Sequence, residues 1–532
     1  MTTTATANAL RLPSGRKTTW SGTLIFGCAV ALGTLYVVTH LIRDLQVVHN
    51  PSILPFLLLG LALFVALGFE FVNGFHDTAN AVATVIYTHS LDPQIAVVWS
   101  GAWNFAGVLF SSGVVAFGIV SLLPVDLILQ VGTASGFAMV FALLVAAIIW
   151  NLGTWYLGLP SSSSHTLIGS IIGVGIANQL IAPSTGTSGV DWTQAVGVGK
   201  SLLLSPLVGF VSAASLLMVA KFAIPRRELY VSPVGTAPPP LWIRLLLILT
   251  CTGVSFAHGS NDGQKGMGLI MLILIGTVPT AYALNRAVPP THVHDFIAVS
   301  AQAVDALASR DDGTVPVGEP RDRLTAFIRS HTLVPETVPA IRTMIRDIAR
   351  ELGAYKELRD VPPELVRNFR NDLYIVNEAL RLLQSSPTPH VIAARDADVI
   401  RQYRRNVDLA TKFIPDWVKV AVAIALGLGT MIGWKRIVVT VGEKIGKEHL
   451  TYAQGAAAEL TAMATIGAAD SFGLPVSTTH VLSSGVAGTM AANSSGLQWN
   501  TIRNLLMAWV LTLPVSIMLS GTLFWLFRTL VS

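Results

Sequence analysis

Two aspartates lie in otherwise apolar stretches whose sequences resemble each other. Asp77 falls within Gly68–Thr88 and Asp262 within Gly253–Ile273. A carboxylate at membrane depth is costly unless it is paired or hydrated, so its default interpretation is functional. The alternative is a carboxylate that caps a helix start. We favour the functional interpretation, because Gly74 and Gly259 close to the aspartates predict polar breaks in these helices, which membranes tolerate only around a cavity.

Two runs of hydroxyl side chains form the second candidate feature. Ser161–Ser164 and Ser477–Thr479 each follow a proline and precede a histidine. Proline favours the first helical turn, and Ser or Thr caps its free N–H groups. Each run therefore predicts the start of a short helix, and such a terminus binds anions, phosphate especially. Ordinary capping would explain one run, whereas two runs favour a tetrahedral anion held between facing helix starts.

Other ionisable residues of the apolar stretches fit either a functional or a structural role. Lys265 is either a functional cation near an anion site or a lysine whose head reaches the membrane surface. The histidines either relay protons or bond to backbone carbonyls, and the glutamates could carry protons: His76, His165, His258, His480, Glu70 and Glu459. No tightly spaced metal-ligand motif such as CxxC or HExxH is present.

Both features occur twice in the chain, in the same order. The stretches around Asp77 and Asp262 match at an offset of 185 residues, and Leu159–Leu167 matches Leu474–Leu482 at an offset of 315. The two offsets differ by 130 residues, which is close to the length of the charged segment Asn285–Lys412. We infer a duplication with an insertion in its second copy. Paired, interrupted apolar segments of this kind indicate a transporter binding site.

The composition indicates a membrane protein with one soluble insert. Of the 532 residues, 52% are hydrophobic and only 12% are charged, whereas soluble proteins are about 25% charged. Between Asn285 and Lys412 lie 18 Lys/Arg and 17 Asp/Glu, more than half of all charges in the chain. This composition excludes a mainly disordered protein, a collagen-like protein and a protein whose main function is to bind nucleic acid.

The elements that position these residues are therefore expected to be membrane helices. Ser21–Ile42 is too long for a signal peptide and predicts the first span. Eleven further apolar segments follow, with Leu241–Phe256 and Gly268–Leu284 counted as two of them. The predicted fold class is all-α: a polytopic membrane protein of about 10–12 transmembrane helices, with inverted repeats, broken half-helices and a soluble helical insert.

The expected domain organisation follows the duplication. We predict an N-terminal tail at 1–20, a first membrane half at 21–222, the start of the second half at 223–284, the insert at 285–412 and the remainder of the second half at 413–532. Loops rich in basic residues usually face the cytoplasm. The loops with Lys221 and Arg226 and with Lys435 and Arg436 are predicted to lie on the side of the insert's flanks, which makes the insert cytoplasmic.

Long motifs across nearly the whole chain resemble the PiT family of inorganic phosphate transporters, and are most similar to the bacterial low-affinity Pit permeases. They read NGFHDTANAVATVIYT, WNLGTWYLGLPSSSSHTLIG, FAHGSNDGQKGMGL, GTMIGWKRIVVTVGEKIGK and LPVSTTHVLSSGVAGTM. The resemblance implies an inverted-repeat carrier, not an enzyme, that moves phosphate by alternating access. It also implies a multi-pass protein of the plasma membrane, the bacterial inner membrane, and no cofactor is expected.

The resemblance also implies most of the site residues, and the sequence around the two aspartates adds Lys265, His76 and Asn261. Those expected to bind phosphate are Asn80, Ser162, Ser163, Ser164, Lys265, Ser477, Thr478 and Thr479. Those expected at the coupling-ion site are Asp77, Asp262, Asn261 and His76, with Asp77 and Asp262 also able to contact a metal ion. His76 and Lys265 depart from the motif, which usually has Asn at both positions.

The departure at Lys265 bears on the coupling ion. A fixed ammonium disfavours a sodium site, so we predict that protons drive uptake of phosphate, or of its neutral complex with a divalent metal ion. The expected partners are phosphate, protons, such metal ions and the lipid bilayer, with no nucleic acid; homo-oligomer formation stays open. Alternatives are a sulfate carrier, a sodium-coupled carrier and a passive anion channel. An intramembrane hydrolase using Ser163, His165 and an aspartate is disfavoured, because the chain has no GxSxG motif.

Overall fold

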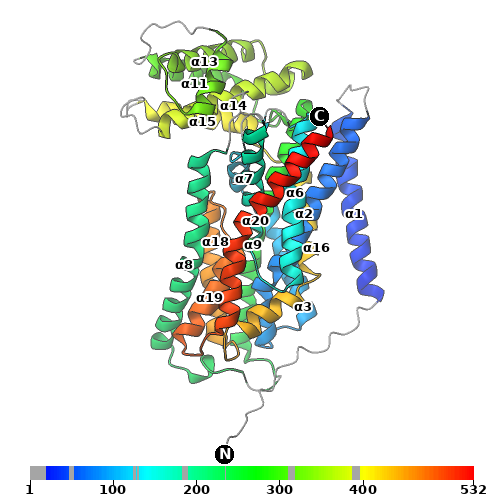
Figure 1. Ribbon diagram of the computed structural model, residues 1–532, viewed down its shortest axis with the longest axis vertical. Coiled ribbons are helices and arrows are strands. Elements are labelled where there is room, and N and C mark those ends of the chain that lie inside the picture. Colours follow the sequence, from blue (N-terminus) through cyan, green and yellow to red (C-terminus); the bar gives the residue numbers. More distant parts are fainter. Residues whose placement is uncertain are drawn as a thin grey trace, which may run out of the picture.

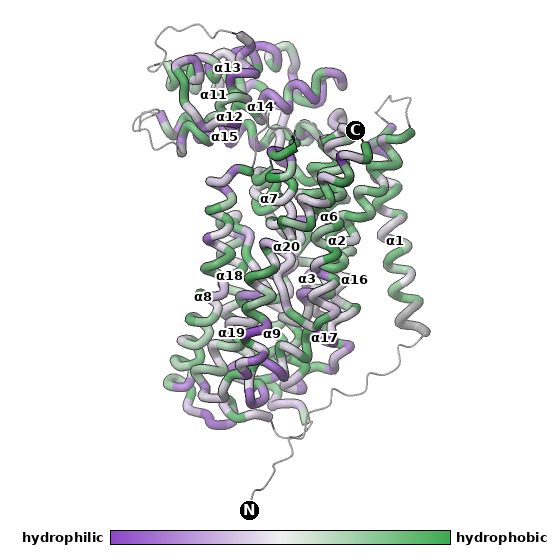
Figure 2. The backbone as a smooth tube through the Cα atoms, in the orientation of Figure 1, coloured by the Kyte–Doolittle hydropathy of each residue, from purple (hydrophilic) through white to green (hydrophobic). Residues whose placement is uncertain are grey.

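The computed structural model describes residues 20–46, 53–123, 127–128, 131–181, 190–233, 235, 237–308, 318–385 and 396–531, without the side chains of 20–23, 78–80 and 385. The described residues form helices and contain no β-strand, which confirms the all-α prediction. Many large apolar side chains on the outer helices face outwards; Phe222, for example, is 91% exposed. Such a surface requires a lipid environment. The protein is therefore a multi-pass membrane protein (Figure 2).

Seven of the described helices are long and apolar enough to cross a membrane. They are α1 (Trp20–Leu45), α2 (Leu54–Tyr87), α6 (Ala134–Tyr156), α7 (Ser163–Ile181), α8 (Trp192–Ala223), α9 (Leu241–Thr277) and α20 (Trp499–Val531). Two bent pairs raise the number to nine if each is one span. These pairs are α3 (Pro93–Phe110) with α4 (Val114–Val120), bent by 78°, and α15 (Ala397–Thr411) with α16 (Asp416–Thr430), bent by 75°.

Two further helices lie in the bundle without meeting these criteria. α18 (Tyr452–Ser471) is rich in alanine and polar residues, and α19 (Thr478–Ala492) has only 15 residues. Both pack against spanning helices, α18 against α9 and α19 against α8. Length and composition thus identify seven to nine spans among the described residues, fewer than the ten to twelve expected. The expected number is larger because it counted α18 and α19 as spans.

Glycines let the helices that carry the two aspartates cross their neighbours closely. At Gly74 of α2, an added Cβ would lie 2.3 Å from the carbonyl oxygen of Leu426 on α16. At Gly259 of α9, it would lie 2.1 Å from the carbonyl oxygen of Asn104 on α3. The contact is reciprocal, since Gly429 of α16 meets α2 and Gly107 of α3 meets α9 in the same way. Each half of the chain therefore packs against a helix of the other half.

The predicted breaks at Gly74 and Gly259 are wrong. Both α2 and α9 are continuous helices through these positions, and α9 joins the segments Leu241–Phe256 and Gly268–Leu284 as far as Thr277. The glycines serve close helix crossing, so the helical backbone hydrogen bonds are kept. Interruptions occur instead before α7 and α19, where the chain is non-helical over Leu159–Ser162 and Leu474–Ser477.

The charged insert forms a helical body at one end of the molecule (Figure 1). Its helices are α11 (His292–Ala306), α12 (Pro320–Ser330), α13 (Thr337–Leu352), α14 (Pro363–Ser385) and α15. They pack around an apolar core that includes Phe296, Ile341 and Leu373. The insert is tied to the membrane helices by an ion pair between Arg381 of α14 and Asp191, the N-cap of α8, with an N–O distance of 2.6 Å.

The prediction that the basic loops lie on the same side of the membrane as the insert's flanks is wrong, because this ion pair fixes the start of α8 at the insert. The 32 residues of α8 extend about 48 Å, so Lys221 near its end lies at the face opposite the insert (Figure 1). The short helix α17 (Lys435–Val439), which carries Arg436, also lies at that far end (Figure 2). The basic loops and the insert's flanks are thus on opposite sides, because one spanning helix separates them. The cytoplasmic position of the insert stays a prediction.

The remaining described helices are short. They are α10 (Pro279–Tyr282), the 3-10 helices η2 (Arg227–Leu229) and η4 (Leu358–Asp360), and a π-helical turn, η5 (Thr440–Lys444), that follows α17.

Candidate functional site

The two hydroxyl runs begin the helices α7 and α19, as predicted. The side-chain oxygen of Ser162 accepts a hydrogen bond from the backbone N–H of His165 at 3.2 Å. Ser477 accepts in the same way from the N–H of His480 at 3.1 Å. Ser162 and Ser477 are therefore the helix caps, and the hydroxyls that follow them lie in the first turns.

The two helix starts lie against each other deep in the bundle. The rings of His165 and His480 are 4.5 Å apart between their centres. The hydroxyl of Ser164 donates to the backbone carbonyl of Val476, just before α19, at 2.9 Å. All of these residues are at least nine-tenths buried. The free N–H ends of two helices thus share one enclosed region, which favours negative charge there.

Asp77 of α2 links both helix starts. Its carboxylate accepts from the hydroxyl of Ser163 on α7 at 2.9 Å and from the hydroxyl of Thr479 on α19. His76 lies beside it, with Nδ1 3.3 Å from a carboxylate oxygen of Asp77 and Nε2 3.1 Å from the hydroxyl of Thr154. Asp77 is 2% exposed, so these neighbours replace its water.

Asp262 of α9 is paired with Lys265 one turn further along the same helix. The distance from Lys265 Nζ to Asp262 Oδ1 is 2.5 Å. Lys265 also donates to the hydroxyl of Ser164 at the start of α7. The ammonium is 1% exposed, and its contacts place it against the polar end of α7 rather than at a membrane surface. The interpretation of Lys265 as a lysine that reaches the surface is therefore wrong.

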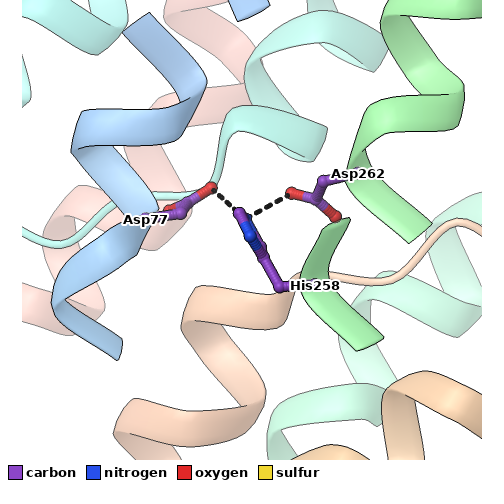
Figure 3. A group of neighbouring side chains, drawn as sticks. All are labelled: Asp77, His258 and Asp262. Carbon is purple, nitrogen blue, oxygen red and sulfur yellow. Dashed lines mark ion pairs between the residues drawn. The ribbon is translucent and has the colours of Figure 1, made fainter. Parts of the chain in front are cut away.

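His258 lies between the two aspartates (Figure 3). Its Nε2 is 3.9 Å from Asp77 Oδ2 and 3.5 Å from Asp262 Oδ2. The three side chains each offer one ligand atom, and these atoms lie within 4.8 Å of one another. Imidazole nitrogen with two carboxylate oxygens is a donor set suited to a divalent cation. In the sequence, the spacing of four residues from His258 to Asp262 on one helix face was the signal for this pairing.

The other predicted residues surround this centre or fall outside the described part. Asn261 donates to the carbonyl of Leu474 at 3.3 Å, and the buried hydroxyl of Thr478 has no partner among the described residues. The side chain of Asn80 lies outside the described residues. The phosphate and coupling-ion roles of the predicted residues stay predictions.

Three carboxylates of the membrane helices were not among the predicted site residues; Glu70 and Glu459 are fully buried and Asp470 is half-buried. Asp470 of α18 accepts from Ser260 at 2.7 Å and from Gln264 at 2.5 Å, both on α9. Glu459 of α18 accepts from the hydroxyl of Thr250 on α9, and Glu70 of α2 packs against Gly266. Glu70 and Glu459 already stood out in the sequence as carboxylates that could carry protons, but the contacts of all three to α9 join distant residues and have no local pattern.

The charges of the centre around Asp77, Asp262 and Lys265 do not cancel. Asp77 and Asp262 carry two negative charges and Lys265 carries one positive charge when all three are ionised. The surplus negative charge disfavours an anion until a proton or a cation enters. Hydroxyl and N–H donors of two helix starts, one ammonium and a cluster of carboxylates together suit joint binding of an oxyanion and a cation.

The chain is similar to known phosphate transporters over most of its length. The sequence model of the phosphate transporter family matches residues 73–520. The low-affinity inorganic phosphate transporter PitA of Escherichia coli K12 is 42% identical over 490 residues, which cover 88% of this chain and 96% of PitA. PitB of the same organism is 40% identical over the same shares. These relatives are named as transporters and not as enzymes.

One solved structure is also similar: a protein described as the sodium-dependent phosphate transporter, with a TM-score of 0.48 and 18% sequence identity. The match covers 89% of this chain and 99% of that one.

Proposed function

The chain belongs to the phosphate transporter family, and we propose that it is a secondary active carrier of inorganic phosphate in the plasma membrane. Phosphate binds between the starts of α7 and α19, where N–H groups, hydroxyls and one ammonium converge. The names of the relatives PitA and PitB, both inorganic phosphate transporters, support this substrate.

The buried ammonium of Lys265 is the observation that carries the proposal. It contacts Asp262 and the hydroxyl of Ser164, so it lies at the start of α7, the end of a helix that favours negative charge. A phosphate oxygen can replace Ser164 as the acceptor, while the hydroxyls of Ser163 and Thr479 turn from Asp77 to the anion. Once a proton or a cation has removed the surplus negative charge of the centre, the ammonium can balance the charge of the anion in this dry, low-dielectric site.

Protons are the coupling ions in this proposal. The centre has one negative charge in excess, and protonation of Asp77, Asp262 or the bridging His258 removes it before a phosphate anion enters. A sodium ion prefers a cage of oxygen ligands, whereas the ammonium of Lys265 and the imidazole of His258 stand next to the carboxylates here. Lys265 thus supplies the positive charge that a metal cation would bring.

A divalent metal ion can travel as part of the cargo. Asp77, His258 and Asp262 offer two oxygens and one nitrogen to a metal ion that arrives bound to phosphate. The neutral metal–phosphate complex then crosses the membrane with less electrostatic cost than free HPO4(2−). The residues present fit such a cargo, since all three are buried and converge on one point (Figure 3).

Uptake of radiolabelled phosphate into proteoliposomes tests the function, with proton and sodium gradients imposed separately. We expect accumulation with an inward proton gradient in the absence of sodium, and competition by unlabelled phosphate rather than sulfate. Strict dependence on sodium would refute the proton coupling. Stronger competition by sulfate than by phosphate would show that sulfate is the substrate. Equilibration of phosphate without accumulation would indicate a passive channel.

A further inference from the structure

A cavity of about 680 Å³ lies at the junction of the insert and the membrane helices. The membrane side of its wall comes from the bend between α3 and α4, from α9 and from Phe472–Gly473. The insert side comes from α14 and α15. The transport function described above does not use this cavity, although its volume exceeds by far what one ordered water requires.

The charged side chains that line the cavity are mostly cationic. Five carry positive charge, whereas two are carboxylates. The cations are Arg370, Arg381, Arg404, Arg405 and Lys412, and the carboxylates are Glu378 and Asp408.

Acidic neighbours compensate two of the five cations. Arg381 pairs with Glu378 at 2.5 Å and with Asp191 at 2.6 Å. Lys412 pairs with Asp408 at 2.9 Å. These three carboxylates are thereby engaged, and the other three cations form no ion pair within the described part of the chain.

Among the three cations without an ion pair, Arg370 gives the strongest evidence for a bound anion. It is only 8% exposed, stacks on the ring of Tyr374 at 5.1 Å and donates to the neutral side chain of Asn371 at 3.4 Å. Burial lowers the pKa of its guanidinium below the ordinary value, which reflects the cost of a buried charge without a counter-ion. Buried charges are normally paired, so this guanidinium calls for an anion.

Arg404 and Arg405 add two more donors of the same kind. Arg404 is held by amide oxygens, those of Asn377 at 3.0 Å and Gln384 at 2.7 Å, which orient its guanidinium. The carboxylates of Asp408 and Glu378 act on it electrostatically but form no ion pair with it. Arg405 is exposed and has no side-chain partner in the described structure. Planar guanidinium groups match phosphate oxygens two at a time, so three of them form a suitable phosphate receptor.

The cavity adjoins the transport site. Gly268 in its wall lies three residues beyond Lys265 on α9, a rise of about 4.5 Å. Gly473, also in the wall, precedes Leu474, whose carbonyl accepts from Asn261. The membrane side of the cavity wall therefore begins within one helical turn of the transport site.

We propose that the junction cavity is a second anion site, in which Arg370, Arg404 and Arg405 bind a phosphate group. The group belongs either to inorganic phosphate on its way to or from the transport site or to the headgroup of an anionic lipid. The choice of phosphate as ligand rests on the proposed function, whereas the need for an anion rests on the unpaired guanidinium groups alone. The insert thereby becomes part of the substrate-handling machinery rather than a mere linker.

Equilibrium binding of radiolabelled inorganic phosphate to the full-length protein tests this site, in nanodiscs of phosphatidylcholine alone. We expect two bound phosphates per chain in the wild type. Arg370→Gln and Arg405→Gln should each weaken one of the two sites by about tenfold or more, the loss of one charged hydrogen-bonding group. Arg370→Lys should restore part of the affinity, and Arg367→Gln, an exposed arginine one turn earlier on α14, should change nothing.

A second arm identifies a lipid occupant. Nanodiscs are made with phosphatidylglycerol, and retained lipid is counted by mass spectrometry after extraction into detergent. A phosphatidylglycerol molecule held by the wild type and lost in the Arg370→Gln and Arg405→Gln variants would support a lipid headgroup as the occupant. Unchanged binding of both phosphate and phosphatidylglycerol in both variants would overturn the proposal. Uptake assays of the wild type run in parallel, so a protein that binds at the junction but does not transport would refute the function and not this site.

Discussion

Lys265 of α9 donates a hydrogen bond to the hydroxyl of Ser164 at the start of α7, 101 positions earlier in the chain. The same ammonium pairs with Asp262 at 2.5 Å. The contact between Lys265 and Ser164 joins the two halves of the protein at the point where the proposed substrate binds. An anion that competes for the ammonium therefore acts directly on the tie between α7 and α9, which connects substrate binding to the relative position of the two helices.

Removal of the ammonium should strongly weaken phosphate binding. Lys265→Gln keeps a donor near Ser164 but leaves Asp262 without its counter-charge. We expect affinity for phosphate to fall on the order of 100-fold, measured by equilibrium binding and by uptake at rising phosphate concentration. Lys200→Gln, at an exposed position of α8, serves as the matched control. Wild-type affinity in Lys265→Gln would remove Lys265 from the site.

The two aspartates should be needed for proton-driven accumulation. Asp77→Asn and Asp262→Asn keep the size of the side chain, but the amide cannot take up a proton in the relevant pH range. We expect loss of uptake driven by a pH gradient in proteoliposomes for each variant. The exposed Asp398→Asn should behave as the wild type. If both site variants still accumulate phosphate against its gradient, the carboxylates do not couple protons to transport.

His258 should control the use of metal ions. His258→Gln removes the nitrogen ligand that lies between the two carboxylates, so two oxygens remain for a divalent ion. We expect stimulation of uptake by Mg²⁺ or Zn²⁺ to weaken, and co-transport of radiolabelled zinc with phosphate to fall by about tenfold. His294→Gln, at an exposed position in the insert, provides the comparison. Equal zinc transport in His258→Gln and the wild type would rule out this ligand set.

The glycines at the helix crossings should be needed for stability rather than for chemistry. Gly74→Ala and Gly259→Ala place a Cβ 2.3 and 2.1 Å from backbone oxygens of α16 and α3, which cannot move aside cheaply. We expect each to destabilise the protein by about 1–3 kcal/mol, seen as an earlier thermal unfolding transition in detergent. Gly68→Ala on α2 meets nothing within 4 Å and should leave the transition unchanged. Identical transitions for all three variants would contradict the close crossings.

Local patterns accounted for much of the candidate site. The start of α7 at Ser163 and of α19 at Thr478 followed from proline and hydroxyl residues, because helix capping depends on a few consecutive residues. Asp77, Asp262 and Lys265 stood out because charge is scarce in the apolar segments. The repeat showed which positions of the two halves correspond.

Other features had no such local signal. Gly74 suggested a break, but its role depends on α16, whose Leu426 is 352 residues away. The prediction that the basic loops lie on the side of the insert was also wrong. The sequence shows that Lys221 and the insert are both charged, but not that the whole length of α8 separates them.

By itself, the sequence determined the membrane class, the two repeated motifs, the two helix starts and the scarce charges within the apolar segments, since all of these depend on composition or on residues close together in the chain. Only the tertiary structure decided that His258 stands between Asp77 and Asp262, that Thr479 reaches Asp77 and that the insert's arginines border a cavity. Those relations join residues from separate helices. They depend on how closely the helices pack, and side-chain packing between distant segments leaves no periodic pattern in the sequence.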